Sequence, residues 1–592
     1  MVFLPVAEIV LRGLFGRGIP ASVPIVQNLT LWVGFLGAAV AARENRLLSL
    51  ATGELLPVGR LRDGARVLAN SVGAGVSAVL ALASLELLII EKDGGLEIGV
   101  GIPVWVVEIV MPFAFAAIAL RLVRRASDRW PGRLAAVAAI LLGVLLSVTG
   151  EGELGPLGGL GTTVLDGLSA WPLVVLVLVA TFLGGPIFVA LGGAALFLFL
   201  AAGVPAAAIP VETYRLSVST TLAAVPLFTL TGFLLAEGRS SERLIRLFSA
   251  FFGWIPGGTA IVTTVLCAFF TVFTGGSGVT ILALGGLLFP ALIKSGYRER
   301  FSIGLLTASG SLGLLWPPAL PLILYAIVAE IPYKDLFLGG LLPGLLLLGL
   351  VAGWGVREGR ITGAGRTRFE RGEALASLWA AKWEVLLPVI VLVAIFGGLA
   401  TIVESAALAA FYSLIIQCFV HRDLSIGKDL LRVLQKSCVL IGGVLIIFGV
   451  AMGFTGYLVD AQVATQALSW VQLHIHHPLV FLLCLNLLLL VVGCLMDIFS
   501  ATVVVVPLIV PIGAAFGIDP IHLGIIFVAN LELGYLTPPV GLNLFLASYR
   551  FNRPLLEVYR ASLPMLAILG FGVLVITYVP WLTTGIFSLL GR

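Results

Sequence analysis

The chain has 592 residues, of which 59% are hydrophobic and 11% are charged, with a mean hydropathy of +1.12. Soluble domains carry roughly 25% charged residues, so this composition excludes a soluble globular protein and indicates a polytopic membrane protein. The formal net charge of +4 is explained by cytoplasmic loops and does not indicate nucleic-acid binding.

Apolar runs long enough to cross a bilayer follow one another from the N-terminal region to the end of the chain. The stretch 1–18 is apolar but contains Glu8 and Arg12 and lacks a small-residue cleavage site. It predicts a short membrane or interfacial helix, not a signal peptide. Roughly 14 to 16 membrane segments are expected, hairpins included. The clearest early runs are 24–42, 64–90, 133–148 and 173–203.

Charged loops and a glycine-rich segment divide the chain. Three loops hold five arginines each and should face the cytoplasm: 43–66, 121–133 and 357–371. The acidic, glycine-rich segment 151–170 has no hydrophobic periodicity and is predicted to be a linker on the outer side. The expected parts are a small helical unit, a connecting helix with its linker, and a large hydrophobic unit: 1–127, 128–170 and 171–592.

The large unit contains an internal repeat. When the chain is aligned with itself, prolines and glycines coincide at one constant offset in the following pairs: Pro290 with Pro511, Gly296 with Gly517, Gly313 with Gly534, Pro317 with Pro538, Pro318 with Pro539, and Pro343 with Pro564. Proline makes up only 30 of 592 residues, so four proline coincidences at one offset indicate a duplication. The two copies are placed at about 171–355 and 375–592.

Corresponding loops of the two copies differ in charge. The segment 294–300 has one lysine and two arginines, whereas its counterpart 515–522 has neither residue type. Likewise, 236–246 has three arginines and 460–470 has none. The positive-inside rule therefore predicts that the copies enter the membrane in opposite orientations. The predicted fold is an all-α membrane protein with inverted repeats, two re-entrant hairpins and two broken helices, plus a small scaffold unit.

Each copy carries glycine, three residues, and two prolines within an apolar stretch: "SGSLGLLWPPALP" at 309–321 and "NLELGYLTPPVGLN" at 530–543. Adjacent prolines break a helix, and Gly313 and Gly534 are expected to let the chain turn. Backbone groups freed inside a membrane must lie within protein or beside a water-filled cavity. Freed carbonyls suit a small cation and freed N–H groups suit an anion. A packed proline kink is the alternative.

A second break is predicted upstream in each copy, at "FTGGSGVT" (273–280) and "CLMDIFSAT" (494–502). Glycines are poor helix residues, so both stretches fit the tips of re-entrant hairpins. Close helix packing is the alternative for the glycine cluster. Asp497 is an ionisable group in an apolar segment, and it is either a cation ligand or a hydrogen-bonded structural carboxylate.

These breaks supply the candidate ligands. Candidate sodium ligands are Gly275, Gly276, Ser277, Gly278, Ser309, Gly310, Gly313, Met496, Asp497, Asn530, Gly534 and Thr537. Candidate substrate ligands are Thr280, Pro317, Pro318, Ser500, Thr502, Pro538, Pro539 and Asn543. Glu532 and Glu404 are further membrane carboxylates, and a proton-coupled mechanism would need Asp497, Glu532 or Glu404 to titrate. Glu532, two residues before Gly534, is expected at or beside the site. Glu404 is equally compatible with pairing inside a scaffold.

Motifs of common enzyme classes are missing from the sequence. It has no GxxxxGK[ST] phosphate loop and no HExxH, and "GGSGV" departs from the GxSxG elbow at its last position. We therefore expect no enzyme activity and no organic cofactor. The tract "HIHH" (His474, His476, His477) is predicted to be a solvated loop, and the five cysteines have no CxxC spacing, so no transition-metal site is expected.

Several stretches resemble a known family. "FTGGSGVTILALGGLLFP", "NLELGYLTPPVGLNLFLAS" and "GGLATIVESAALAAFYSLI" resemble the large membrane subunit of tripartite ATP-independent periplasmic (TRAP) transporters. "VQNLTLWVGFLGAAVAAREN" resembles the small membrane subunit, so the chain resembles a natural fusion of the two. It departs from the family pattern at the "GGSG" tip, at "LLWPPALP", and at "TIVESAA", which lacks a proline. Backbone ligands would survive such substitutions.

The resemblance implies a sodium-coupled importer of small organic acids, the carboxylates, in the bacterial inner membrane. It also implies an elevator mechanism and delivery of the cargo by a periplasmic substrate-binding protein. Two alternatives remain: a stand-alone sodium- or proton-coupled anion transporter without a binding protein, and a non-transporting membrane scaffold.

Overall fold

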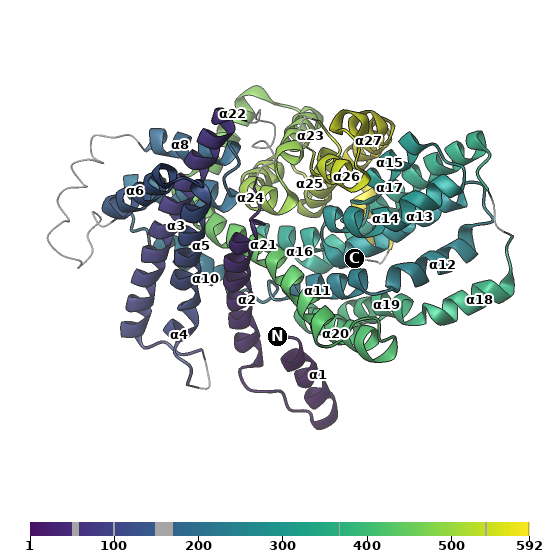
Figure 1. Cartoon of the computed structure of the whole chain (residues 1–592), viewed down its shortest axis with the longest axis horizontal. Helices are drawn as coiled ribbons and strands as arrows, with labels where there is room; N and C mark the ends of the chain where they lie inside the picture. The colour runs from purple at the N-terminus through teal and green to yellow at the C-terminus, as the bar shows by residue number, and fades with distance from the viewer. Residues whose placement is uncertain are drawn as a thin grey trace. The chain divides into compact units, whose positions relative to one another are not determined.

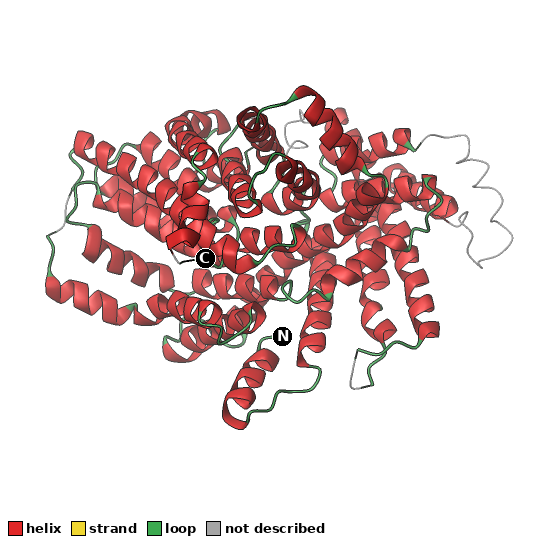
Figure 2. Cartoon of the chain, turned by 180° about the vertical axis from the view of Figure 1, so that it is seen from behind, coloured by secondary structure: helices red, strands yellow, loops and turns green. Residues whose placement is uncertain are grey.

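The computed structural model describes residues 1–49, 59–98, 101–147, 170–365, 368–538, 541–589 and 591. These residues form helices and loops and contain no strand (Figure 2). Ten helices among them are long and apolar enough to cross a membrane, or eleven if one pair bent by 63° is a single span. The expected 14 to 16 segments exceed this count because apolar helices shorter than 18 residues, including a hairpin arm, are not in it.

The described chain divides into two compact units. The first unit comprises Met1, Val10–Pro226 and Gln435–Ala464, and the second comprises Val2–Ile9, Leu227–Leu434 and Thr465–Arg592. The short helix α1 (Phe3–Phe15), expected near the N-terminus, contributes residues to both units. The predicted linker 151–170 lies outside the described residues except for Ala170.

The first unit is a bundle around the long helix α3. Its helices are α2 (Ser22–Glu44), α3 (Arg60–Gly94), α4 (Val104–Glu108), α5 (Val110–Ala126), α6 (Trp130–Ser147), α8 (Trp171–Phe182), α9 (Ile187–Ala201), α10 (Ala208–Ser217) and most of α21 (Lys428–Asp460). Helix α3 packs against α5 and α6. A Cβ on Gly75 would come 2.9 Å from the carbonyl oxygen of Ala139, so this small residue lets α3 and α6 approach closely.

The span expected at 173–203 is not continuous. Helix α8 ends at Phe182 and α9 begins at Ile187, so the run is divided in two. Gly184 has a φ of 100°, which favours glycine, and Pro186 stands immediately before α9. Apolar composition alone did not reveal this break, because the intervening residues are themselves uncharged.

The second unit holds both candidate hairpins. Its helices are α11 (Ala224–Glu237, apart from its first residues), α12 (Ser240–Phe252), α13 (Gly258–Thr274), α14 (Ser277–Lys294), α15 (Glu299–Ser309), α16 (Leu320–Val328), α17 (Tyr333–Thr362), α18 (Arg371–Ala380), α19 (Lys382–Phe396), α20 (Ile402–Ile415), the π-helix η2 (Ile416–Val420), α22 (Val463–His474), α23 (Pro478–Leu495), α24 (Ile498–Ala515), α25 (Pro520–Gly534), α26 (Leu542–Phe551), α27 (Leu555–Tyr578) and α28 (Trp581–Leu589). Figure 1 shows α23, α25 and α27 side by side, and α25 packs against both of the others.

Helix bounds in this unit recur at the offset found in the sequence. Helix α14 covers Ser277–Lys294 and α24 covers Ile498–Ala515, so both ends are displaced by the same offset that relates the paired prolines. The first residues of α15 and α25, Glu299 and Pro520, are related in the same way. The succession of hairpin, helix, break and helix is therefore the same in both copies. Their opposite orientation in the membrane stays a prediction.

Candidate functional site

The tip of the first hairpin is two glycines long. Helix α13 ends at Thr274 and α14 begins at Ser277, as predicted for 273–280. Gly275 has a φ of 64°, and a Cβ there would overlap the side chain of Leu320. A residue with a side chain would thus be strained and would also push the tip away from the start of α16. Glycine therefore positions this tip against the second half of the first broken helix.

Hydroxyl groups gather behind the first tip. The Thr271 hydroxyl lies 2.8 Å from the Thr280 hydroxyl and donates to the Gly310 carbonyl at 2.8 Å. The Thr274 hydroxyl lies 3.3 Å from that of Thr280. All these side chains are buried. The cluster joins the hairpin to the first break, and Thr280 belongs to it as a structural member.

Several predicted ligands around the first break carry buried polar atoms without partners. The Ser277 and Ser309 hydroxyls and the Asn543 side-chain oxygen make no hydrogen bond with the described residues. A Cβ on Gly310 would lie 3.3 Å from the Ser277 carbonyl oxygen, and Asn543 donates to the Thr307 carbonyl at 3.2 Å. Since an unsatisfied buried polar atom is costly, these groups are suited to holding a ligand.

The second hairpin is held by a carboxylate. Helix α23 ends at Leu495 and α24 begins at Ile498, with Asp497 as its N-cap. One Asp497 carboxylate oxygen accepts from the N–H groups of Phe499 at 2.9 Å and Ser500 at 3.1 Å, and the other accepts from the Ser500 hydroxyl at 2.7 Å. Asp497 is therefore a hydrogen-bonded structural carboxylate, one of the two roles expected for it. A carboxylate has about four acceptor sites, so one remains for a cation.

The second tip is tied to the second break by two backbone donors. The Ile498 N–H donates to the Tyr535 hydroxyl at 2.6 Å, and the Gly541 N–H donates to the Cys494 carbonyl at 3.1 Å. Helix α25 ends at Gly534 and α26 begins at Leu542, so this helix is broken as predicted. Of the two prolines, Pro538 lies in the break, and Pro539 lies outside the described residues.

The role expected for the two glycines near the prolines is wrong. Neither Gly313 nor Gly534 has a positive φ, so neither is needed for a left-handed turn. A Cβ on Gly313 would overlap the Ala268 carbonyl oxygen, and one on Gly534 would lie 2.6 Å from Gly493. Both glycines therefore permit close packing between a broken helix and the first arm of its own hairpin.

Three other predicted ligands already have hydrogen-bond partners. The Asn530 amide donates to Asn486 at 2.6 Å and to the Ile526 carbonyl at 2.8 Å. The Thr502 and Thr537 hydroxyls each donate to a carbonyl four residues earlier in the chain, at 2.6 and 3.1 Å. These three side chains already make hydrogen bonds, whereas the Ser277 and Ser309 hydroxyls make none with the described residues.

The remaining predicted residues lie at the same tips and breaks. Gly276 and Met496 belong to the hairpin tips, and Gly278 and Ser500 lie in the first turns of α14 and α24. Pro317 and Pro318 lie in the first break. Thr271, Tyr535 and Ser311 also lie at these sites but were not predicted from the sequence. Tyr535 could have been noticed, because it stands next to Gly534 where the first copy has Leu314. Thr271 lies inside an ordinary apolar run and gave no signal.

At these sites the helices of one copy pack against helices of the other. Helix α14 of the first hairpin packs against α26, and α24 of the second hairpin packs against α16. A Cβ on Gly278 would overlap the side chain of Leu546, which shows how close the first pair lies. Each hairpin thus meets the second half of the other copy's broken helix, all within one compact unit.

The membrane carboxylates outside the tips differ from one another. Glu404 forms a capping box at the start of α20, where it accepts from the Thr401 N–H at 2.7 Å and donates its own N–H to the Thr401 hydroxyl at 3.2 Å. Glu532 is 1% exposed and lies beside the Ser311 hydroxyl of the first break. Its two carboxylate oxygens have no hydrogen-bond partner of good geometry among the described residues.

The histidine tract ends a helix and begins the next. The His474 ring stacks on Trp470, with centroids 4.5 Å apart, and His477 accepts from the Leu479 N–H at 3.2 Å. No group of three or more metal-ligating side chains is found among the described residues.

Family models match almost the whole chain. The DctM component of tripartite ATP-independent periplasmic transporters matches residues 174–582, and the DctQ component of these transporters matches residues 1–132.

Curated relatives are similar over long stretches. The isethionate TRAP transporter permease protein DctMQ of Oleidesulfovibrio alaskensis is 32% identical, over 94% of this chain and 87% of that protein. The C4-dicarboxylate TRAP transporter large permease protein DctM of Pseudomonas aeruginosa is 36% identical, over 64% of this chain and 89% of its own length. The ectoine TRAP transporter large permease protein TeaC of Halomonas elongata is 30% identical, over 59% and 82%.

Among solved structures, the YdaH transporter of Alcanivorax borkumensis aligns with a TM-score of 0.46 at 16% identity, over 62% of this chain and 86% of that one.

Proposed function

The chain belongs to the tripartite ATP-independent periplasmic transporter family, as a fused small and large permease, and we propose that it imports small organic acids together with sodium. It is a multi-pass protein of the inner membrane. Permeases of this family work with a periplasmic substrate-binding protein. The identity of the cargo, the coupling ion and the elevator movement described below are our proposals.

One observation carries the proposal: two hairpin tips and two helix breaks meet within one compact unit and leave buried oxygen atoms without partners. Oxygen atoms from serine, backbone carbonyls and a carboxylate are the ligands that a hard monovalent cation takes. We assign one sodium ion to the first tip with the first break, near Ser277 and Ser309. A second belongs to the second tip, where Asp497 retains one acceptor site.

The substrate is placed between the two tips. Asn543 is the second residue of α26, and its side chain donates to the Thr307 carbonyl in the first broken helix, so it lies where the two copies meet. The N–H groups at the starts of α16 and α26 suit a carboxylate, because the first turn of a helix leaves its donors unsatisfied. Sodium ions bound at the two tips would offset the negative charge of the acid. Binding of sodium would therefore favour binding of the acid, which would couple their transport.

In the proposed cycle, the unit that holds both hairpins moves across the membrane with the cargo and the ions. The other helices stay in place and support it. This elevator movement is supported by the crossed packing of the hairpins and broken helices, since a site shared by both copies has to move as one body. The binding protein delivers the acid from the outer side.

Uptake into proteoliposomes tests the proposal. The full chain is reconstituted, the cognate binding protein is added outside, and a panel of labelled carboxylates and one sulfonate is offered with and without a sodium gradient. Uptake that requires both sodium and the binding protein supports the proposal. Sodium-dependent uptake without the protein indicates a stand-alone transporter. No uptake of any acid in the presence of a sodium gradient and the binding protein would contradict the proposal.

A proton-coupled transporter is the second candidate, and Glu532 is the observation that favours it. Glu532 is a buried carboxylate whose two oxygens have no well-formed hydrogen bond among the described residues, and an ionisable group within a membrane is the kind that a proton relay uses. If a proton gradient alone drives uptake, and Glu532→Gln abolishes it, the ion is a proton and the sodium sites are wrong.

A further inference from the structure

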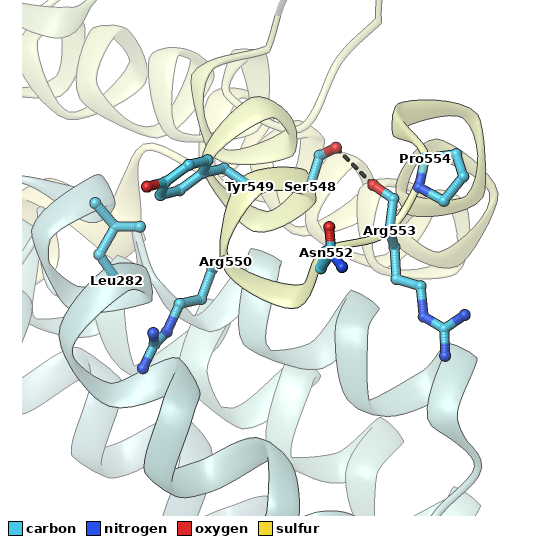
Figure 3. A pocket seen from close by; sticks show the side chains of 7 residues that line it. All are labelled: Leu282, Ser548, Tyr549, Arg550, Asn552, Arg553 and Pro554. Carbon is cyan, nitrogen blue, oxygen red and sulfur yellow. Dashed lines mark hydrogen bonds between the residues drawn. The ribbon is translucent and has the colours of Figure 1, made fainter.

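An open cleft lies at the C-terminal end of α26, away from the hairpin tips. Its volume is about 1000 Å³, and it is lined by Leu282 on α14 and by residues 548–550 and 552–554 (Figure 3). None of these residues belongs to the sites proposed above. Two of them are arginines, Arg550 and Arg553.

The turn after α26 is tightly bonded. Asn552 has a φ of 51°, and its N–H donates to the Ser548 carbonyl. The Arg553 N–H donates to the same carbonyl at 3.2 Å, and the Ser548 hydroxyl donates to the Arg553 carbonyl at 2.6 Å, the bond drawn in Figure 3. Because the end of the helix is capped in this way, its carbonyl dipoles are partly satisfied and oppose an anion less.

The two arginines differ in how their charge is used. Arg553 forms an ion pair with Glu299 at the start of α15. Arg550 forms no ion pair and no hydrogen bond with any described residue. In Figure 3 its side chain runs towards α14, where a Cβ on Gly286 would overlap its guanidinium and one on Gly285 would lie 3.1 Å from its Cγ. Two adjacent glycines therefore make room for one unpaired guanidinium.

The cleft combines charge with apolar surface. Leu282 forms an apolar wall and is 36% exposed, and Tyr549 is 83% exposed. Arg553 pairs with Glu299, which stands between Arg298 and Arg300, so the positive-inside rule puts the C-terminal end of α26 on the cytoplasmic side. A phenol ring and an arginine beside apolar surface are typical of the level of lipid headgroups. A free anion in water would gain nothing from the leucine.

The first copy offers an internal comparison. Its half-helix α16 ends at Val328 and is followed by Ala329, Glu330, Ile331 and Pro332, without an arginine. The basic cleft is therefore not a by-product of the duplication. It occurs in the copy whose half-helix ends at the side where acidic lipid headgroups attract basic residues.

We propose that this cleft binds the phosphate headgroup of an acidic phospholipid in the cytoplasmic leaflet. The Arg550 guanidinium donates to the phosphate oxygens, which its planar fork matches. Arg553, held by Glu299, adds positive field at the rim, and an acyl chain lies along Leu282. This assignment is independent of the cargo and of the coupling ion.

Native mass spectrometry of the full chain, released from nanodiscs that contain phosphatidylglycerol and phosphatidylethanolamine, tests the proposal. The wild-type chain should retain phosphatidylglycerol in preference to phosphatidylethanolamine. Arg550→Gln should lower that preference about fivefold, the effect of one basic residue near a lipid surface. Arg550→Lys should recover only part of it, because a lysine keeps the charge but loses the fork.

Lys294→Gln is the matched control, since Lys294 is exposed, basic and at the C-terminal end of α14 but does not line the cleft. It should leave the preference unchanged. Equal effects of Lys294→Gln and Arg550→Gln would overturn the proposal and indicate general surface electrostatics. Displacement of the lipid by millimolar glycerol phosphate alone would also overturn it, because the site would then take a free anion.

Discussion

In the first hairpin, Gly275 and Gly276 stand between α13 and α14, whereas Met496 and Asp497 stand between α23 and α24 in the second. The second arms, α14 and α24, begin and end at equivalent positions of the repeat, so their backbone lengths are equal. The first tip is shaped by glycine, and the Ser277 hydroxyl that follows it has no partner among the described residues. The second tip is shaped by a carboxylate that caps the next helix. The second arms of the two hairpins are thus equal in length, but the helix that follows each tip begins differently: after glycines in the first copy and after a capping aspartate in the second.

The largest effect is expected at Asp497. Asp497→Ala should lower sodium-dependent uptake at least about 30-fold, since loss of one member of a buried charged pair costs about 2–5 kcal/mol. Loss of the cap should lower the free energy of unfolding by only about 1 kcal/mol. Uptake in proteoliposomes and thermal unfolding of the same sample are the two measurements.

Asp519→Ala is its control. Asp519 caps α25 in the same way, accepting from Ile521 and His522 at 2.8 and 3.1 Å, but lies away from both tips. It should cost the same stability, about 1 kcal/mol, and leave uptake intact. If the two variants affect uptake equally, Asp497 acts only as a cap.

Next are the paired glycines of the two breaks. Gly313→Ala and Gly534→Ala should each lower the free energy of unfolding by about 1–3 kcal/mol, because the added methyl group meets backbone that has little room to shift. Thermal unfolding in nanodiscs measures both. Gly349→Ala, in α17 with nothing within 4 Å of its Cβ, should be neutral or slightly stabilising. A neutral result at only one of the two breaks would show that the copies do not pack alike.

The serines after the two tips should separate binding from folding. Ser500→Ala removes a hydroxyl that donates to Asp497, and it should cost about 1 kcal/mol of stability. Ser277→Ala removes a hydroxyl without a partner and should leave stability nearly unchanged. Its apparent affinity for sodium should fall about tenfold, equal to roughly 1.4 kcal/mol for one lost ligand contact. Unchanged sodium affinity in Ser277→Ala would remove Ser277 from the cation site.

The smallest effect is expected for Glu404→Gln. Glutamine can replace glutamate in a capping box, so stability should change by less than about 0.5 kcal/mol and uptake should persist. Glu404→Ala should cost about 1 kcal/mol by losing the cap. Loss of uptake in Glu404→Gln with unchanged unfolding would instead make this carboxylate a proton carrier.

The sequence predicted the two tips and the two breaks because proline, glycine and a lone aspartate are rare in apolar helices and change the backbone visibly. It did not predict the break at Gly184–Pro186, which has no counterpart in a repeat pattern. The packing role of Gly313 and Gly534 was also missed, since close approach depends on a partner distant in sequence. Asn530 was selected by residue type, but Asn486 engages its amide.

The crossed contact between α14 and α26 bears on the order in which the chain is made. Gly278 belongs to the first copy and Leu546 to the second, yet the two touch in the finished protein. Because synthesis adds only about 5–20 residues per second, the first hairpin waits roughly tens of seconds for the helix that covers it. During that interval its glycine face and its unpartnered hydroxyls must be shielded by lipid, by neighbouring helices of the first copy or by the insertion machinery. The moment at which α26 arrives is therefore when the first half can complete its fold.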